Sequence, residues 1–461
     1  MIYENHSVKE LKIAYIGGGS RGWAWTLMND LAKATDMSGT VYLYDIDFEA
    51  AKNNETIGKK FPGTGWEYKA VRTAEEAMTG ADFVIISILP ATFDEMEFDV
   101  HAPEKYGIYQ SVGDTAGPGG FFRALRTVPM MREIAANVRK HCPRAWVINY
   151  TNPMTVCVKA LYSAFPKIKA FGCCHEVFGT QQLLRRMIEE QLGLTDIERR
   201  DIRVNVIGVN HFTWLTEGHY FGHDIFPMYK EFAAKHFVDG IATTFGEDHI
   251  NNSFACRNRV KFDLFQRYGY LAAAGDRHLA EFCPGDWYLE SPEQVRDWMF
   301  GLTTVAWRKN DLKERLARSA RLVSGEEEFV IKNTGEEGVM QMRAILGLGD
   351  IVTNVNMPNY GQIPNLPLGA VVETNAAFTS GMVTPVAAGE IPAPLYPLIS
   401  RISGNQEMLV KGCVERDLDL IFTAFVNDPL VRLPLDKSRE LFARMVKNTA
   451  KYLPDYDLST L

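Results

Sequence analysis

The N-terminal part of the sequence predicts an α/β fold built on a Rossmann-like, doubly wound parallel sheet. Short strand-like apolar runs alternate there with helical patterns, and the first run, residues 11–16, breaks at Gly17, Gly18 and Gly19. After about residue 195, long helical stretches dominate. We therefore expect a Rossmann-like domain over 1–195, followed by a mainly helical α+β domain over 196–461 for catalysis and oligomerisation.

The elements of the first domain follow one another in regular alternation. Strands are expected at residues 11–16, 41–44, 66–71, 83–88, 145–149 and 169–173. Helices are expected at 23–34, 48–60, 121–141, 153–165 and 179–192. Right-handed crossovers between such strands place helices on both faces of one sheet.

The second domain has fewer strand-like segments. Helices are expected at residues 229–237, 250–269, 292–319 and 437–452, and strands at 202–209 and 370–373. Residues 357–367 and 387–397 are rich in Pro, Gly or Asn and are expected to form structured loops.

Composition and charge exclude several classes of protein. The net charge is −8, from 49 basic and 57 acidic residues, so we expect no nucleic-acid partner. No apolar run has the length of a membrane span, which favours a cytoplasmic protein without a membrane partner. The seven cysteines lack paired C-x-x-C spacings, so free thiols in a reducing compartment are expected.

The glycine turn has the pattern of a dinucleotide site. Gly17, Gly19 and Gly22 form G-x-G-x-x-G after a strand, where backbone N–H groups can face a pyrophosphate, and Ser20 adds a hydroxyl donor. Asp45 follows Gly22 by 23 residues, close to the spacing of a ribose-binding carboxylate, and this favours NAD over NADP. Asp45 could instead be a helix cap or a surface acid.

Polar clusters follow three further strand ends, at residues 149–153, 173–176 and 210–212. A thiolate from Cys174 and an imidazole from His211 could hold one divalent ion with positions left open for substrate. Taken alone, the same pair could be a small buried cysteine and a core histidine.

These motifs together resemble family 4 glycoside hydrolases, the NAD- and metal-dependent glycosidases. The matching segments, in order, are residues 16–20, 44–47, 117–126, 151–153, 174–177, 209–211 and 363–373. The resemblance implies that Cys174 and His211 bind a Mn²⁺-like ion, that Asn152 and His175 contact the sugar, and that the glycine turn holds NAD. It also implies a homodimer or a larger homo-oligomer.

The general base is left open by the resemblance, because the family uses a Tyr in some branches and an Asp in others. Gly275, Asp276, Arg277 and His278 occupy the corresponding segment and resemble the Asp version. Tyr268 and Tyr270 precede it and are the alternatives, and Asp276 could also be a surface turn residue.

The resemblance implies cleavage by oxidation at C3 of the sugar, removal of the C2 proton, elimination, water addition and re-reduction, with His175 as a plausible acid or an orienting residue. The sequence His-Glu-Val after Cys174 is most similar to the α-galacturonidase branch. The expected substrate is thus a small glycoside or an oligouronide with α-linked galacturonic acid. Arg123, Arg126 and Arg277 are candidate partners for its carboxylate.

Other activities are compatible with the same motifs. Within the family, an α-glucosidase, an α-glucuronidase or an α-galactosidase is the nearest alternative. Outside it, a NAD-dependent sugar or hydroxyacid dehydrogenase would share the N-terminal architecture, as would a non-enzymatic NAD-binding interaction protein.

Overall fold

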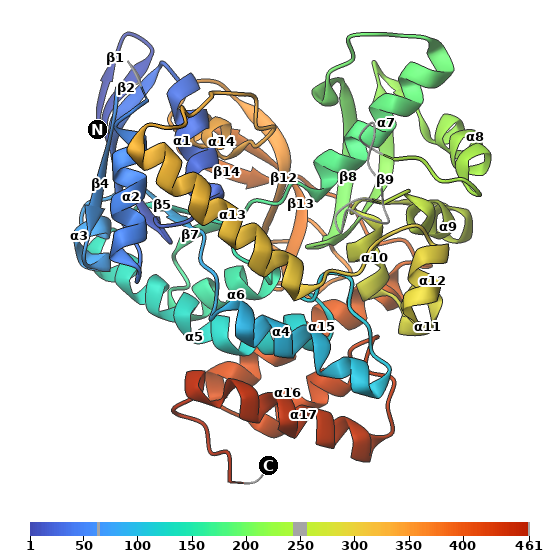
Figure 1. Ribbon diagram of the computed structural model, residues 1–461. Coiled ribbons are helices and arrows are strands. Elements are labelled where there is room, and N and C mark those ends of the chain that lie inside the picture. The colour runs from blue at the N-terminus through green and yellow to red at the C-terminus, as the bar shows by residue number, and fades with distance from the viewer. Residues whose placement is uncertain (62–64, 243–255, 460–461) are drawn as a thin grey trace.

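A ten-stranded sheet runs through the centre of the molecule (Figure 1), in a computed structural model that describes residues 1–61, 65–242 and 256–459. Its parallel part has the strand order β4-β3-β2-β5-β6-β7. These strands are β2 (Ser7–Ile16), β3 (Met37–Tyr44), β4 (Trp66–Val71), β5 (Phe83–Ile86), β6 (Trp146–Asn149) and β7 (Lys169–Gly172). This order is that of a Rossmann fold, so the predicted doubly wound sheet is confirmed.

The strands are buried on both faces because successive side chains alternate between two layers of helices. On β2, Ile13 and Tyr15 pack into one layer, and Ala14 and Ile16 pack into the other. The first layer contains α1 (Trp23–Lys33), α2 (Phe48–Gly58) and α14 (Gly338–Ile345), and the second contains α3 (Ala74–Met78), α5 (Gly117–His141) and α6 (Met154–Ala164).

Strands from the second half of the chain extend the same sheet. β12 (Ile351–Pro358) pairs antiparallel with β7, and β13 (Val371–Thr379) and β14 (Met382–Pro385) follow it. A short β1 (Ile2–Glu4) pairs with β2. The division at residue 195 stays a prediction, but the main sheet takes strands from both sides of it.

A second, antiparallel sheet lies beside the first. It contains β8 (Ile202–Val209), β9 (Phe212–Tyr220), β10 (His223–Asp224) and β11 (Leu271–Ala272). Its core is shared with α7 (Glu176–Leu192), α8 (Phe226–His236) and α9 (Arg259–Tyr268). The short helices α10 (Asp276–Phe282), α11 (Gly285–Tyr288) and α12 (Pro292–Asp297) follow on the same side.

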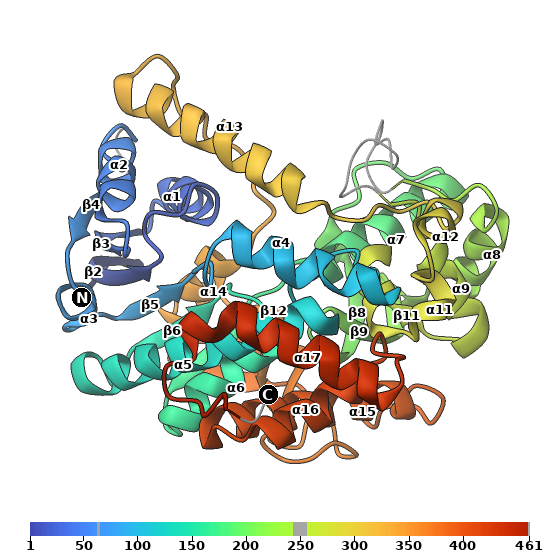
Figure 2. The same ribbon diagram turned by 60° about the horizontal axis from the view of Figure 1, so that its bottom comes forward.

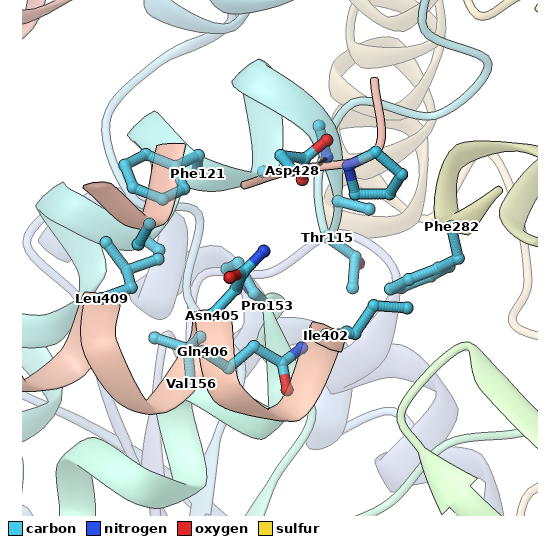
Figure 3. A pocket seen from close by; sticks show the side chains of 16 residues that line it. Thr115, Phe121, Pro153, Val156, Phe282, Ile402, Asn405, Gln406, Leu409 and Asp428 are labelled. Carbon is cyan, nitrogen blue, oxygen red and sulfur yellow. Dashed lines mark hydrogen bonds between the residues drawn. The ribbon is translucent and has the colours of Figure 1, made fainter. Parts of the chain in front are cut away.

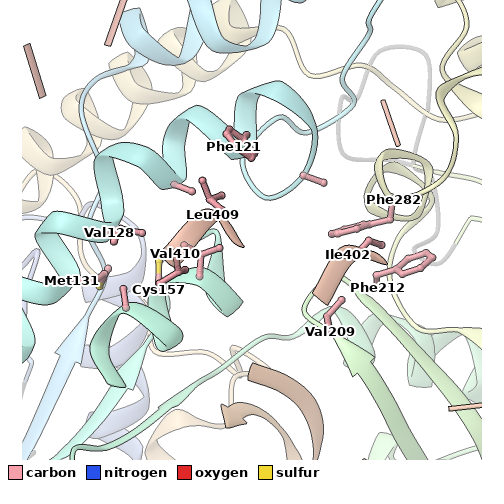
Figure 4. Packing of buried hydrophobic residues seen from close by; sticks show 14 of the residues in the cluster. Phe121, Val128, Met131, Cys157, Val209, Phe212, Phe282, Ile402, Leu409 and Val410 are labelled. Atoms are coloured by element: carbon pink, nitrogen blue, oxygen red, sulfur yellow. The ribbon is translucent and has the colours of Figure 1, made fainter. Parts of the chain in front are cut away.

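The C-terminal helices pack beneath α5 and α6. They are α15 (Tyr396–Glu415), α16 (Leu418–Val426) and α17 (Leu435–Thr449). Figure 4 shows part of the core that joins them to the sheet, with Phe121, Val128 and Cys157 on one side and Leu409 and Val410 on the other.

A long helix, α13 (Val305–Ser324), packs against α2 and against α4 (Phe93–His101) (Figure 2). The predicted helix at 292–319 is therefore wrong as one element, since α12 and α13 are separate. Buried Phe300 bridges Cys256, and the Thr303 N–H donates to the Ser111 carbonyl, so tertiary contacts fix the chain between them. Thr304 then caps α13.

The predicted helix at 250–269 is shorter than expected. Residues 250–255 lie outside the described part of the chain, and α9 begins only at Arg259. Within the described ranges, no helix combines the length and apolar character needed to cross a membrane.

Candidate active site

The glycine turn after β2 is packed so closely that side chains are excluded. Gly17 has φ +91°, and a Cβ there would lie 2.0 Å from the Ser87 carbonyl oxygen. A Cβ on Gly19 would lie 2.6 Å from the Ala50 Cβ. The turn is therefore pressed against the end of β5 and the start of α2, with no room for side chains at these two glycines.

Two side chains hold the turn from within. The Asp45 carboxylate accepts hydrogen bonds from the N–H groups of Gly19 and Asp47, each at 2.9 Å. The buried Asn54 amide donates to the carbonyls of Gly18 and Ser20 at 2.8 and 2.9 Å. Asp47, not Asp45, is the side chain that caps α2, so the Asp45 carboxylate lies at the turn.

The first turn of α1 has no side-chain cap, because Gly22 occupies the N-cap position. Its N–H groups thus suit an anion such as a pyrophosphate. Trp23, the first residue of α1, stacks on Tyr150 at 5.0 Å and on His175 at 5.8 Å between ring centroids. This stack joins the glycine turn to the residue that follows Cys174.

Cys174 lies at the end of β7 in a buried and negatively charged setting. Burial, followed by the carboxylates of Glu373 and Glu176, raises the pKa of its thiol well above the usual range. The thiol is hydrogen-bonded to the Asn210 side chain, and the Asn210 amide donates to Glu373 at 3.1 Å. Cys174 and the Asn210-His211 pair are thus brought together.

His211 is buried and held by Thr115. The Thr115 hydroxyl lies 3.0 Å from the His211 Nδ1 and donates its own proton to Asp114 at 2.7 Å. The hydroxyl must then accept from His211, so Nδ1 carries the proton and Nε2 keeps its lone pair. Burial lowers the pKa of His211 to about 3, which keeps the ring neutral as a metal ligand must be.

The donor set fits a divalent cation of the manganese type. A buried thiol beside two carboxylates needs a positive charge to ionise, and the imidazole beyond Asn210 presents a lone pair. The Oδ1 atoms of Asn152 and Asn210 are buried without a hydrogen-bond partner among the described residues. No group of three or more His, Cys, Asp or Glu ligands occurs in that part of the chain, and a two-ligand site leaves positions open for substrate oxygens.

The other predicted sugar contacts lie around this pair. The His175 side chain is 50% exposed, and its Nδ1 lies 3.1 Å from Glu336. Burial opposes protonation, but the Glu336 carboxylate raises the pKa of His175 to about 9. Arg123 donates from Nε to the Asn152 carbonyl at 2.9 Å, so the predicted contacts Asn152 and Arg123 touch each other.

Asp276 is not brought to this site. Its side chain is fully buried, and Oδ1 accepts from the Lys261 N–H at 3.1 Å near the start of α9. His278 is the side chain of that segment that reaches the site: its ring centroid lies 3.9 Å from that of His211, and its Nε2 lies 3.5 Å from Glu176. Glu176 also accepts from the Gly275 N–H at 2.8 Å.

The alternative tyrosines pack elsewhere. Tyr268 ends α9, and its ring contacts Trp214 edge-on at 5.7 Å. Tyr270 is partly buried against the main hydrophobic core. The assignment of the base therefore stays a prediction.

Two of the three arginines considered for a carboxylate have structural roles. Arg126 is 2% exposed and forms a bidentate ion pair with Asp99. Arg277 is 5% exposed and donates to the Ser111 carbonyl at 3.1 Å. Both guanidinium groups are thus engaged by protein groups, and a role for either toward a substrate carboxylate stays a prediction.

A small, mainly apolar cavity of about 40 Å³ lies behind the start of α5 (Figure 3). Phe121, Ile402 and Leu409 line it, and Thr115 and Pro153 form its border with the site. Its carboxylate, the partly buried Asp428, accepts from the N–H groups of Gly117 and Leu430. Thr115 therefore lies between the site and this cavity, whose polar lining residues are Asn405, Gln406 and Asp428.

Sequence reasoning missed several residues of the site. Trp23 directly follows the third glycine and Thr115 closely precedes the G-P-G-G segment, so both had a local signal. Asn54 lies within the same local segment but carries no motif of its own. Glu336 and Arg308 had no local signal, because each comes from a loop or helix remote in sequence from the residue it contacts.

Comparison with known proteins agrees with these features. The family 4 glycosyl hydrolase model matches residues 12–190, and the model of the C-terminal domain of the same family matches residues 206–431. The chain is 58% identical to an alpha-galacturonidase of Thermoanaerobacterium saccharolyticum, over 99% of this chain and 100% of the relative. It is 51% identical to an alpha-galacturonidase of Bacillus subtilis, over 96% and 98% of the two chains.

Solved structures share the fold. A crystal structure of a Bacillus subtilis protein with 51% identity matches with a TM-score of 0.92, over 95% of this chain and 100% of the other. A 6-phospho-alpha-glucosidase from gut microorganisms, solved with NAD and Mn²⁺, has 19% identity and a TM-score of 0.82, over 97% and 100%. Both halves of the sequence and their joint sheet thus place the chain in family 4 of the glycosyl hydrolases.

Proposed function

We propose that the protein is an α-galacturonidase that uses NAD and a divalent cation such as Mn²⁺. The observation that carries the proposal is the contact between Trp23 and His175, because it joins the glycine turn to the Cys174 and His211 pair. The alpha-galacturonidases that are 51% to 58% identical over nearly the whole chain support the choice of sugar.

The cation and the dinucleotide each have a set of residues that could hold them. Cys174 and His211 would hold the cation, and Gly17, Gly19, Ser20, Gly22 and Asp45 would hold the dinucleotide. When bound, NAD⁺ would supply a reversible hydride acceptor for C3, and the cation would supply positive charge that stabilises negative charge on the substrate oxygens. Asn152 and Arg123 would contact the sugar beside them.

His175 is placed to act as the general acid. Its Nδ1 faces the Glu336 carboxylate at 3.1 Å, and half of its side chain is exposed. An imidazolium held in this way can deliver a proton from Nε2 to the oxygen of the leaving group.

For removal of the C2 proton we propose His278. Its Nε2 faces Glu176, and its Nδ1 is buried without a hydrogen-bond partner in the described part of the chain. A carboxylate-bound imidazole with one free nitrogen has the arrangement of a general base. Asp276, the residue expected from the family pattern, has no exposed surface and would instead hold the start of α9.

A solvent-exchange experiment separates the two candidates. The enzyme is incubated in D₂O with galacturonide, NAD⁺ and Mn²⁺, and deuterium at C2 is followed by NMR. We expect His278→Asn to lose exchange and Asp276→Asn to keep it in the folded fraction, which circular dichroism measures. Exchange that survives in His278→Asn and is lost in folded Asp276→Asn would return the base to Asp276.

The activity itself is tested with a panel of p-nitrophenyl α-glycosides and α-uronides, with NAD⁺, Mn²⁺ and a thiol supplied. We expect p-nitrophenol release from the galacturonide without net NADH, because the cofactor ends in its starting state. Steady growth of the NADH absorbance band would instead indicate a sugar dehydrogenase. Preference for a glucoside, a glucuronide or a galactoside would keep the mechanism and change the substrate.

A homodimer or larger homo-oligomer and a cytoplasmic location belong to the same proposal. Light scattering on the eluting peak of a size-exclusion column tests the first, and fractionation of the source cells tests the second.

A further inference from the structure

One arginine from outside the motif segments, Arg308 in the first turn of α13, lies next to the site. Its Nη2 is 3.9 Å from the Asp114 carboxylate, and its side chain is 18% exposed. Its Nε is buried without a hydrogen-bond partner within the described ranges. A guanidinium with an unused donor beside the site is suited to an anionic ligand.

Asp114 connects this arginine to the predicted metal ligand. The carboxylate accepts from the Thr115 hydroxyl at 2.7 Å, and that hydroxyl holds His211. Burial opposes its ionisation, but the charges of Arg308 and Arg123 hold the pKa of Asp114 well below its usual range. The Asp114 carboxylate thus interacts with two guanidinium groups and accepts a hydrogen bond from one hydroxyl.

Arg123 completes the cationic pair. Its Nε donates to the Asn152 carbonyl, and its terminal amino groups make no hydrogen bond or ion pair with the described residues. Around Asp114, two guanidinium charges face one carboxylate, so this corner of the site has an excess of positive charge. In a pyranose uronate, the carboxylate on C5 lies across the ring from O2 and O3.

We propose that Arg308 binds the carboxylate of the terminal galacturonate, together with Arg123, and thereby selects uronides over neutral sugars. The inference rests on the proposed function and adds the residue that sets its specificity. Because α13 packs on α2 and α4, the selecting group is carried by a helix that also covers the dinucleotide-binding side.

The test compares a charged and a neutral sugar of the same configuration. Inhibition constants of free D-galacturonate and D-galactose are measured with NAD⁺ and Mn²⁺ present, together with kcat/KM for the matching p-nitrophenyl glycosides. In Arg308→Met we expect galacturonate to bind about 100-fold more weakly. Galactose affinity should change less than about threefold. Arg308→Lys should fall between, because it keeps the charge and loses the planar fork.

The matched control is Arg321→Met, which removes an exposed ion pair with Glu327 near the other end of α13. It should leave both inhibition constants unchanged. Equal loss of galacturonate and galactose binding in Arg308→Met, with weaker Mn²⁺ binding, would overturn the inference, since Arg308 would then only support Asp114. Unchanged galacturonate binding would also overturn it.

The outcome also separates this inference from the proposed function. If the wild type binds galacturonate through Arg308 but does not cleave the galacturonide, the subsite stands and the hydrolase assignment fails. If the wild type cleaves the galacturonide and Arg308→Met does so equally well, the function stands and the subsite fails.

Discussion

The glycine turn and the Cys174 and His211 pair lie next to each other but are built in different ways. Residues 17 to 54 supply the whole turn, including the Asp45 and Asn54 side chains that hold it. The metal and sugar region draws on loops and helices far apart in sequence, as the contacts of Thr115 with His211, Asn210 with Glu373 and His175 with Glu336 show. A substitution in a site built from one segment should affect that site alone. A site assembled from distant segments should lose function when any one of its supporting contacts is removed.

The largest effect on activity is expected for Cys174→Ser, in the metal and sugar region. A serine hydroxyl does not ionise as a thiol does, so the cation loses its anionic ligand. We expect activity to fall at least about 1,000-fold. Mn²⁺ binding by equilibrium dialysis should weaken, while NAD⁺ affinity and the circular dichroism spectrum should not change. Full turnover by this variant would remove Cys174 from the site.

Gly17→Ala tests the glycine turn in the same way. The new Cβ would clash with the Ser87 carbonyl at a position with φ +91°. We expect the NAD⁺ dissociation constant, measured by calorimetry, to rise about 10- to 100-fold. Mn²⁺ affinity should stay unchanged, since no residue of the turn is an expected ligand. A parallel loss of Mn²⁺ binding would mean that the two regions are not independent.

Thr115→Val should have a smaller effect, of about 10-fold, on Mn²⁺ affinity. The substitution keeps the shape of the side chain and removes the hydroxyl that holds His211 and donates to Asp114. NAD⁺ binding is the internal control and should not move. Unaltered Mn²⁺ affinity would show that the His211 ring is fixed by its neighbours alone.

The smallest effect on turnover is expected for Glu281→Gln. This substitution should instead change how the free energy of unfolding depends on pH. The Oε1 atom of Glu281 accepts from the N–H groups of Val112 and Gly113, next to Asp114. Burial, opposed by these two bonds, raises the pKa of Glu281 to about 8 from 4.5. Its stabilising contribution is therefore fully present below pH 4.5 and is lost as the pH rises through 8.

Glutamine keeps the acceptor and removes the titration. The stability of Glu281→Gln relative to wild type should therefore increase by a few kcal/mol between pH 5 and pH 8.5. Melting temperatures at several pH values measure this difference. A difference that is constant with pH would show that Glu281 titrates normally.

The same contrast explains what could be predicted from the sequence. The strands and glycines of the first half carry local signals, and β4 (Trp66–Val71) and β8 (Ile202–Val209) have the predicted bounds. β9 and β12 to β14 were not predicted in full. β9 pairs with its neighbour β8, and β14 with its neighbour β13, whereas β12 also pairs with β7, which lies far away in sequence. The residues of the site differ in the same way. Cys174 and His211 belong to short sequence motifs, whereas Glu336 and Arg308 act only through tertiary contacts.

The antiparallel extension of the main sheet has a consequence for how the protein is made. A nascent chain that has emerged only to residue 195 carries all six parallel strands, yet β7 lacks β12 beside it and its edge is open. About 160 more residues must be synthesised before that edge can be covered. During this interval the open β7 edge could pair with another copy, and we expect slow translation of the second half to favour aggregation.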